Sequence, residues 1–66
     1  MPITEWERWA VAHRVLEQHG ERAIDHCAER AKALALAGDE HGVALWVDIA
    51  GRIDQLRGPS GGERLH

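Results

Sequence analysis

Histidine and glutamate side chains spaced one helical turn apart are the residues of this sequence best suited to hold a metal ion. His26 precedes Glu29 by three residues, and His13 precedes Glu17 by four. Helical bundles with di-iron centres use Glu-x-x-His, the reverse order of the first pair, and need matching ligands from facing helices. We therefore expect surface or stacked histidines and no metal or other cofactor. A metal-dependent bundle built on these four residues is the alternative hypothesis.

Nucleophilic side chains are scarce. Cys27 is the only cysteine, and it falls in an apolar stripe between Ile24 and Ala31. No cation is placed there to stabilise a thiolate, so the thiol should act as a small buried hydrophobe. Ser60 is the only serine and lies beyond the expected helices. The sequence therefore predicts no catalytic residues and no enzymatic activity.

The three tryptophans are the only aromatic residues apart from histidine, since the chain has no tyrosine or phenylalanine. Trp6 and Trp9 are three residues apart, so both can face one side of a helix. They could form a stacking surface for a ligand or a single-stranded base. We favour a structural role for these two and for Trp46, as bulky fillers in the core or at a dimer interface.

The charge pattern argues against nucleic acid as a partner. Eight Lys and Arg residues face eleven Asp and Glu residues, for a net charge of −3. A helix-turn-helix would place the start of the third segment near phosphates, but that segment opens with Asp39 and Glu40, and its cations, Arg52 and Arg57, come late. A small helix-turn-helix-like nucleic-acid-binding regulator therefore remains the alternative function.

Capping signals divide the chain into three helices. Thr4 and Glu7 have the spacing of a capping box, and Gly20 can close the helix that follows. Gly38 can close a second helix, while Asp39 can cap a third, which Pro59 forces to end. These signals predict helices over about 4–19, 21–37 and 39–57, with a flexible, disordered tail at 59–66.

The second and third segments differ in the width of their apolar faces. The stripe of the second segment consists mostly of alanine and Cys27, so a neighbouring backbone can approach closely, and we expect this helix to be the central one. Apolar residues of the third segment cover an arc of roughly 200°, against little over 100° for a helix packed on one side. That arc comprises Val43, Leu45, Trp46, Val47, Ile49, Ala50, Ile53 and Leu56.

The expected architecture is all-α: a small three-helix bundle formed by a single domain, residues 1–58. A chain of this size buries only about 60% of its unfolded surface, and a single core of under ~70 to 80 residues rarely supplies more than ~3 to 5 kcal/mol. With one cysteine, neither an intramolecular disulfide nor a multi-thiolate zinc site can add stability. We therefore expect a homodimer or a stable protein partner.

No segment approaches the roughly 20 apolar residues of a membrane span, and the opening residues MPITEWERW lack the apolar run of a secretory signal. A cytoplasmic protein without a membrane partner is therefore expected.

The layout of the chain also resembles a known group of sequences. It has HG at 19–20, AERAKAL at 28–34, GDEHG at 38–42, Trp46, and isoleucines at 49 and 53. This pattern is similar to that of short, uncharacterised all-helical proteins common in alphaproteobacteria. The resemblance covers most of residues 13–56. It implies a bacterial, intracellular three-helix unit, and it implies no activity or site residues.

These observations together predict a non-enzymatic protein-interaction module. It would self-associate or dock a partner through the apolar face of the third helix, supplemented by the first. The expected interface residues are Trp6, Trp9, Leu45, Trp46, Ile49, Ile53 and Leu56.

Overall fold

The computed structural model describes residues 3–58. It contains the helices α1 (Glu5–His19), α2 (Ala23–Leu36) and α3 (Glu40–Leu56), with a 3-10 turn, η1 (Gly20–Arg22), between the first two. Residues 3–58 include no strand, so the all-helical class is confirmed, and the helix ends differ from the predicted ones by two residues at most. The tail predicted at 59–66 lies outside the described residues. Within 3–58, no helix is both long and apolar enough to cross a membrane.

Both predicted N-terminal caps are present. The Thr4 hydroxyl accepts a hydrogen bond from the Glu7 backbone N–H at 3.1 Å, and the Thr4 N–H donates to Glu7 Oε1 at 2.8 Å, which completes the capping box of α1. In α3, Asp39 Oδ1 accepts from the Gly42 N–H at 2.9 Å. Each cap satisfies a backbone donor that the helix itself leaves free.

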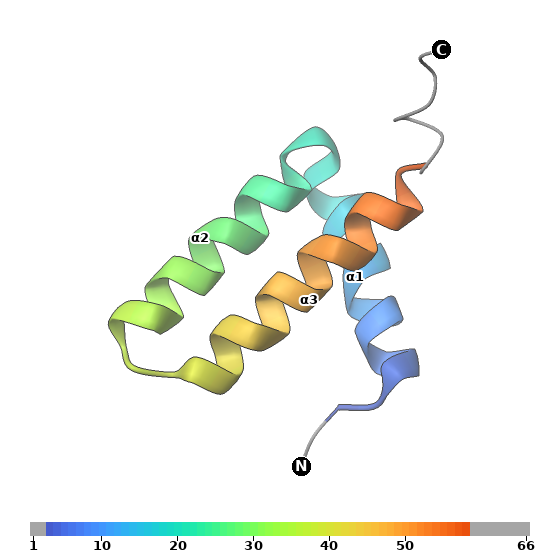
Figure 1. Cartoon of the computed structure of the whole chain (residues 1–66). Coiled ribbons are helices and arrows are strands. Elements are labelled where there is room, and N and C mark those ends of the chain that lie inside the picture. The colour runs from blue at the N-terminus through green and yellow to red at the C-terminus, as the bar shows by residue number, and fades with distance from the viewer. Residues whose placement is uncertain (1–2, 59–66) are drawn as a thin grey trace.

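The turn between α2 and α3 depends on Gly38, which has a φ of +81°. The Asp39 N–H donates to the Leu34 carbonyl at 2.9 Å, and the Gly38 N–H donates to the Ala35 carbonyl at 3.0 Å. This pair of bonds is the Schellman pattern, which needs a left-handed residue and so favours glycine. The turn folds α3 back along α2, and the two helices lie antiparallel and side by side (Figure 1).

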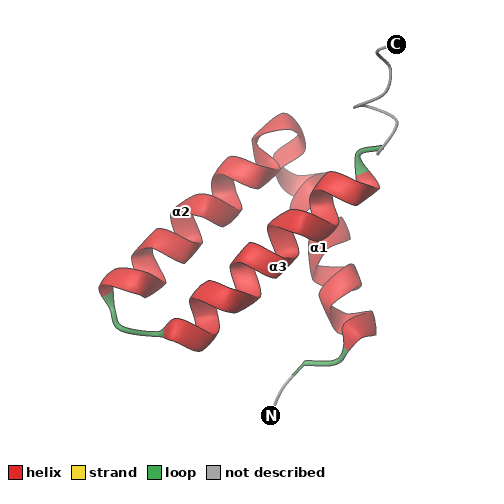
Figure 2. Ribbon diagram, viewed as in Figure 1, coloured by secondary structure: helices red, strands yellow, loops and turns green. Residues whose placement is uncertain are grey.

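Helix α3, and not α2, is the central helix. It packs against α2 along its length and also against α1, whereas α1 touches α2 much less. Figure 2 shows α1 behind α3, near the end where α2 begins. The prediction of a central second helix was therefore wrong. The narrow, alanine-rich stripe of α2 serves one neighbour, while the broad apolar arc of α3 can be covered from two sides.

The core is small. The largest fully buried side chains of the described residues include Ile49 and Ile53, which form one cluster with buried residues of α1 and α2. The other buried residues are small or medium in size, and partly buried residues such as Leu45 and Trp46 surround them. The complete buried set within the described residues is Ala12, Val15, Ala23, Cys27, Ile49 and Ile53. A core of this size gives the fold only a small free energy of unfolding, as expected from the length of the chain.

Candidate protein-interaction surface

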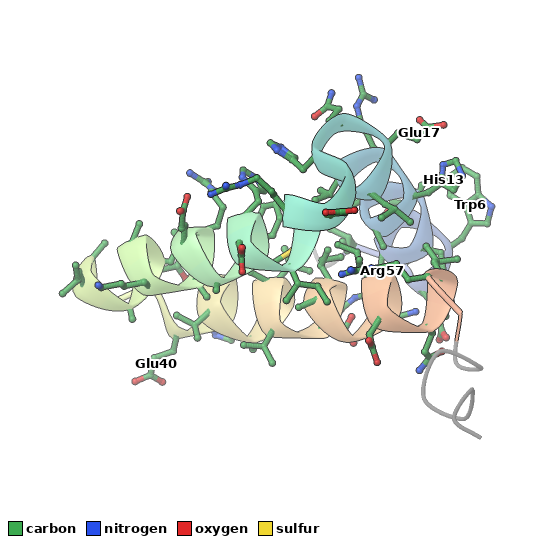
Figure 3. The ribbon with its side chains drawn as sticks, turned by 90° about the horizontal axis from the view of Figure 1, so that it is seen from above. Trp6, His13, Glu17, Glu40 and Arg57 are labelled. Atoms are coloured by element: carbon green, nitrogen blue, oxygen red, sulfur yellow. The ribbon has the colours of Figure 1, made fainter. Side chains whose placement is uncertain are left out.

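An exposed aromatic surface lies on the outer side of α1. Trp6, Ala10 and His13 follow one another along the helix, and Trp9 and Leu56 border the same shallow hollow, whose volume is about 390 Å³. We call these five residues the Trp6 surface. Trp6 is 75% exposed and Leu56 is 42% exposed. Figure 3 shows Trp6 and His13 next to each other, pointing away from the rest of the molecule.

The periodicity of α1 places Trp6 outside the fold. Residues 6, 10 and 13 are spaced four and three apart, so they form one stripe along a helix. The buried residues of α1, Ala12 and Val15, lie on the opposite side. Because the two sets face opposite ways, the Trp6 indole cannot reach the core without turning the helix over. Its exposure is a direct consequence of the sequence.

Charged side chains fix the position of α1 on α3. Arg8 Nη1 lies 3.1 Å from Asp48 Oδ2, and Arg52 Nε lies 2.8 Å from the same oxygen. Arg52 Nη1 also lies 3.6 Å from a Glu5 carboxylate oxygen. The Arg52 side chain is only 15% exposed, and its guanidinium stacks 4.7 Å from the centre of the Trp9 ring. This polar cluster links the N-terminal half of α1, which carries the Trp6 surface, to α3.

The cluster changes the acidity of Asp48. The hydrogen bond from Arg52 is the main reason that the pKa of the Asp48 carboxyl lies below its ordinary value of 3.8, and Arg8 adds to this effect against the opposing effect of burial. A carboxyl group whose pKa is lowered by folding stabilises the fold above its unfolded pKa. That stabilisation disappears as the pH falls through the lower, folded pKa.

We therefore expect the wild-type protein to lose stability below about pH 4 more steeply than the variant Asp48→Asn. The midpoint of urea unfolding, measured across the acid range, checks this difference. Asp54→Asn is the matched control, since Asp54 is an exposed carboxylate on the same helix. It should retain the wild-type acid slope. Equal slopes for the wild type and Asp48→Asn would mean that the cluster does not form in solution.

The structure covers part of the interface that the sequence predicted. Ile49 and Ile53 are 0% exposed and belong to the core, so they offer no surface to a second chain, and their assignment to an interface is corrected. Leu45 is partly buried against the same core. Most of the broad arc of α3 is covered, with Val47 and Leu56 as the exceptions, because α1 packs on one side of it and α2 on the other. Trp6 and Leu56 remain exposed, and Trp9 is partly buried.

Trp46, which was predicted as a filler in the core or at an interface, lies between α2 and α3. It is partly buried and lines an apolar groove with small residues of α2, among them Cys27, Ala28 and Ala31. The Arg30 guanidinium lies 5.6 Å from the centre of its ring, and the His26 ring meets it edge-on at 5.8 Å. These contacts leave Trp46 as part of the packing between α2 and α3, and it is not part of the Trp6 surface.

The predicted ligand pairs do not converge on a metal site. The His26 ring stacks on His19 at 4.1 Å, and His13 forms its own exposed pair with Glu17 at 3.7 Å. In the described part of the chain, no group of three or more potential metal ligands gathers in one place. Cys27 is buried, and burial raises the pKa of its thiol, which favours the neutral form over the nucleophilic thiolate.

Sequence reasoning missed the residues of the polar cluster. The spacing of Asp48 and Arg52, four apart on a helix, was a usable signal for an ion pair. The partnership of Arg8 with Asp48 spans 40 residues and has no local signal. Val47 was counted in the apolar arc of the third helix, but it is 61% exposed and lies outside the buried core.

No curated protein and no solved structure matches this chain. A family model does match, over residues 4–60, and its description is a family of unknown function, DUF6961. The matched range takes in all three helices and both turns between them. The chain therefore belongs to the DUF6961 family.

Proposed function

We propose that this protein is a non-enzymatic protein-interaction module of a bacterial cytoplasm that self-associates through the Trp6 surface. The observation that carries the proposal is the 75% exposure of Trp6, the residue type with the largest apolar side chain, beside a second exposed apolar residue, Leu56. Tryptophan is enriched in protein interfaces, where it supplies much of the binding energy. Adjacent exposed apolar side chains of this size mark an interaction surface.

The size of the core supports the same proposal. The six buried residues found within residues 3–58 include no aromatic side chain, and only Ile49 and Ile53 among these six are large aliphatics. Small domains with so little buried surface commonly gain stability by oligomerisation when they have no disulfide or structural metal. Covering Trp6 and Leu56 with a second chain would add apolar burial that the single chain does not achieve.

The nucleic-acid alternative has less support. Its phosphate contacts would need free cations near the start of α3, where Asp39 and Glu40 lie, and Glu40 points to solvent (Figure 3). Arg8 and Arg52 already pair with Asp48. We expect no mobility shift of duplex DNA at low salt, and a salt-dependent shift would favour the regulator instead.

Dilution followed by nuclear magnetic resonance tests the proposal within one sample series, because Trp6 and Trp46 report on different places. We expect the indole N–H signal of Trp6 to move as the protein is diluted through the micromolar range. The signal of Trp46, which packs between α2 and α3, is the internal control and should stay in place. If none of the three indole signals moved on dilution, self-association would be contradicted. If only the Trp46 signal moved, the chain would associate through a surface other than the Trp6 surface.

A further inference from the structure

We infer that two copies of the chain pair through α1 in antiparallel orientation, with Ala10 at the two-fold axis. This inference rests on the proposed function and specifies the geometry of the association. Ala10 is exposed and lies between Trp6 and His13 on the outer side of α1. Its small side chain allows two helices to approach closely at the point where they cross. A larger side chain at this position would keep the two helices apart.

The positions around Ala10 are complementary to themselves only in the antiparallel orientation. With a two-fold axis at residue 10, a residue that lies n positions before Ala10 in one copy is opposite the residue that lies n positions after Ala10 in the other copy. Trp6 and Arg14 are both four residues from Ala10. The indole of one copy would therefore meet the guanidinium of the other, which is a favourable cation–π pair.

The charges of α1 follow the same symmetry. Glu7 lies three residues before Ala10, whereas His13 and Arg14 lie three and four residues after it, and all three are exposed. Antiparallel pairing brings the glutamate of each copy to the basic positions of the other, whereas parallel pairing would set like charges together. The capping contact uses Oε1 of Glu7, and the carboxylate keeps its charge. The pattern therefore selects a second copy as the occupant of the Trp6 surface.

Leu56 extends the contact beyond α1. It borders the same hollow as Trp6, Ala10 and His13 although it comes from α3. Two copies related by the axis would each present this side chain next to the paired helices. Glu17, at the far end of the stripe, pairs with His13 in its own chain and lies seven residues from the axis, at the rim of the contact.

A charge exchange tests the inference. Arg14→Glu and Glu7→Lys each place like charges opposite one another, so each variant alone should associate about tenfold more weakly than the wild type, or weaker still. Mixed in equal amounts they should form a heterodimer, because positions 7 and 14 then carry opposite signs in both halves of the contact. Glu29→Lys, a charge reversal at an exposed site of α2, is the control and should not change association. Sedimentation equilibrium on the wild type, the three variants and the mixture measures these differences.

A disulfide test avoids altering the α1 cap. Ala10→Cys should form a disulfide-linked dimer under mild oxidation, because the two-fold axis brings equivalent positions within bonding range. Glu17→Cys should link far more slowly, and the native Cys27 is buried. The antiparallel geometry is wrong if the charge variants associate as the wild type does and Glu17→Cys forms its disulfide as fast as Ala10→Cys. In that case the proposed function still stands, provided that the wild type associates and needs Trp6 to do so. A wild type that is monomeric at every concentration overturns both.

Discussion

The variant Ile49→Ala is expected to be largely unfolded at room temperature. Ile49 is fully buried and sits on α3 where that helix packs against its two neighbours. Removing this much of a buried aliphatic side chain typically costs ~2 to 5 kcal/mol. A single core of this size gives a free energy of unfolding of roughly 3 to 5 kcal/mol in total, so this one substitution can remove most of the stability. Far-ultraviolet circular dichroism, with a urea titration, measures the loss of helix.

The matched control is Val47→Ala, two residues away on the same helix. Val47 is 61% exposed, so its truncation should change the free energy of unfolding by about 0.5 kcal/mol or less. Comparable destabilisation by both variants would mean that α1 and α2 do not cover α3 in the way described above. If Ile49→Ala unfolded at the same urea concentration as the wild type, Ile49 would not be part of the core.

The second large effect concerns association. We expect Trp6→Ala to weaken self-association by roughly 30-fold or more, the equivalent of the ~2 kcal/mol that defines an interface hot spot. Within the monomer, Trp6 is 75% exposed, so the same substitution should leave the stability of the single chain nearly unchanged. Sedimentation equilibrium measures the first quantity, and urea unfolding at a concentration where the variant is monomeric measures the second.

Leu36→Ala separates the effect of Trp6 from a general effect of exposed apolar residues. Leu36 is 82% exposed, more than Trp6, and it ends α2, outside the Trp6 surface. Its truncation should leave the dissociation constant at the wild-type value. If Leu36→Ala weakened association as much as Trp6→Ala, the contact would involve the other end of the molecule or would be unspecific.

Local signals predicted the helices well. Thr4 with Glu7, and Gly38 with Asp39, act over three to five residues, and each forms the hydrogen bonds expected from its spacing. The exposure of Trp6 also has a local cause, since Ala12 and Val15 bury the opposite side of α1. Features of this kind can be derived from the sequence because the helix itself fixes which residues share a side.

The coverage of α3 could not be predicted in the same way. Ile49 and Val47 are both aliphatic and both fall within the broad apolar arc, yet one is fully buried and the other is mostly exposed. The difference depends on where α1 crosses α3. That crossing is held in part by the contact of Arg8 with Asp48, 40 residues apart, and neither residue shows locally which partner it will meet. The predicted interface therefore included residues that belong to the core.

Sedimentation velocity on untagged protein, run at a series of concentrations for the wild type beside Trp6→Ala, tests self-association through the Trp6 surface most directly. The predicted result is a wild type that changes from monomer to dimer through the micromolar range, while Trp6→Ala remains a monomer with the same helix content. A wild type that sediments as a monomer at every concentration, or a Trp6→Ala variant that dimerises as the wild type does, would contradict it.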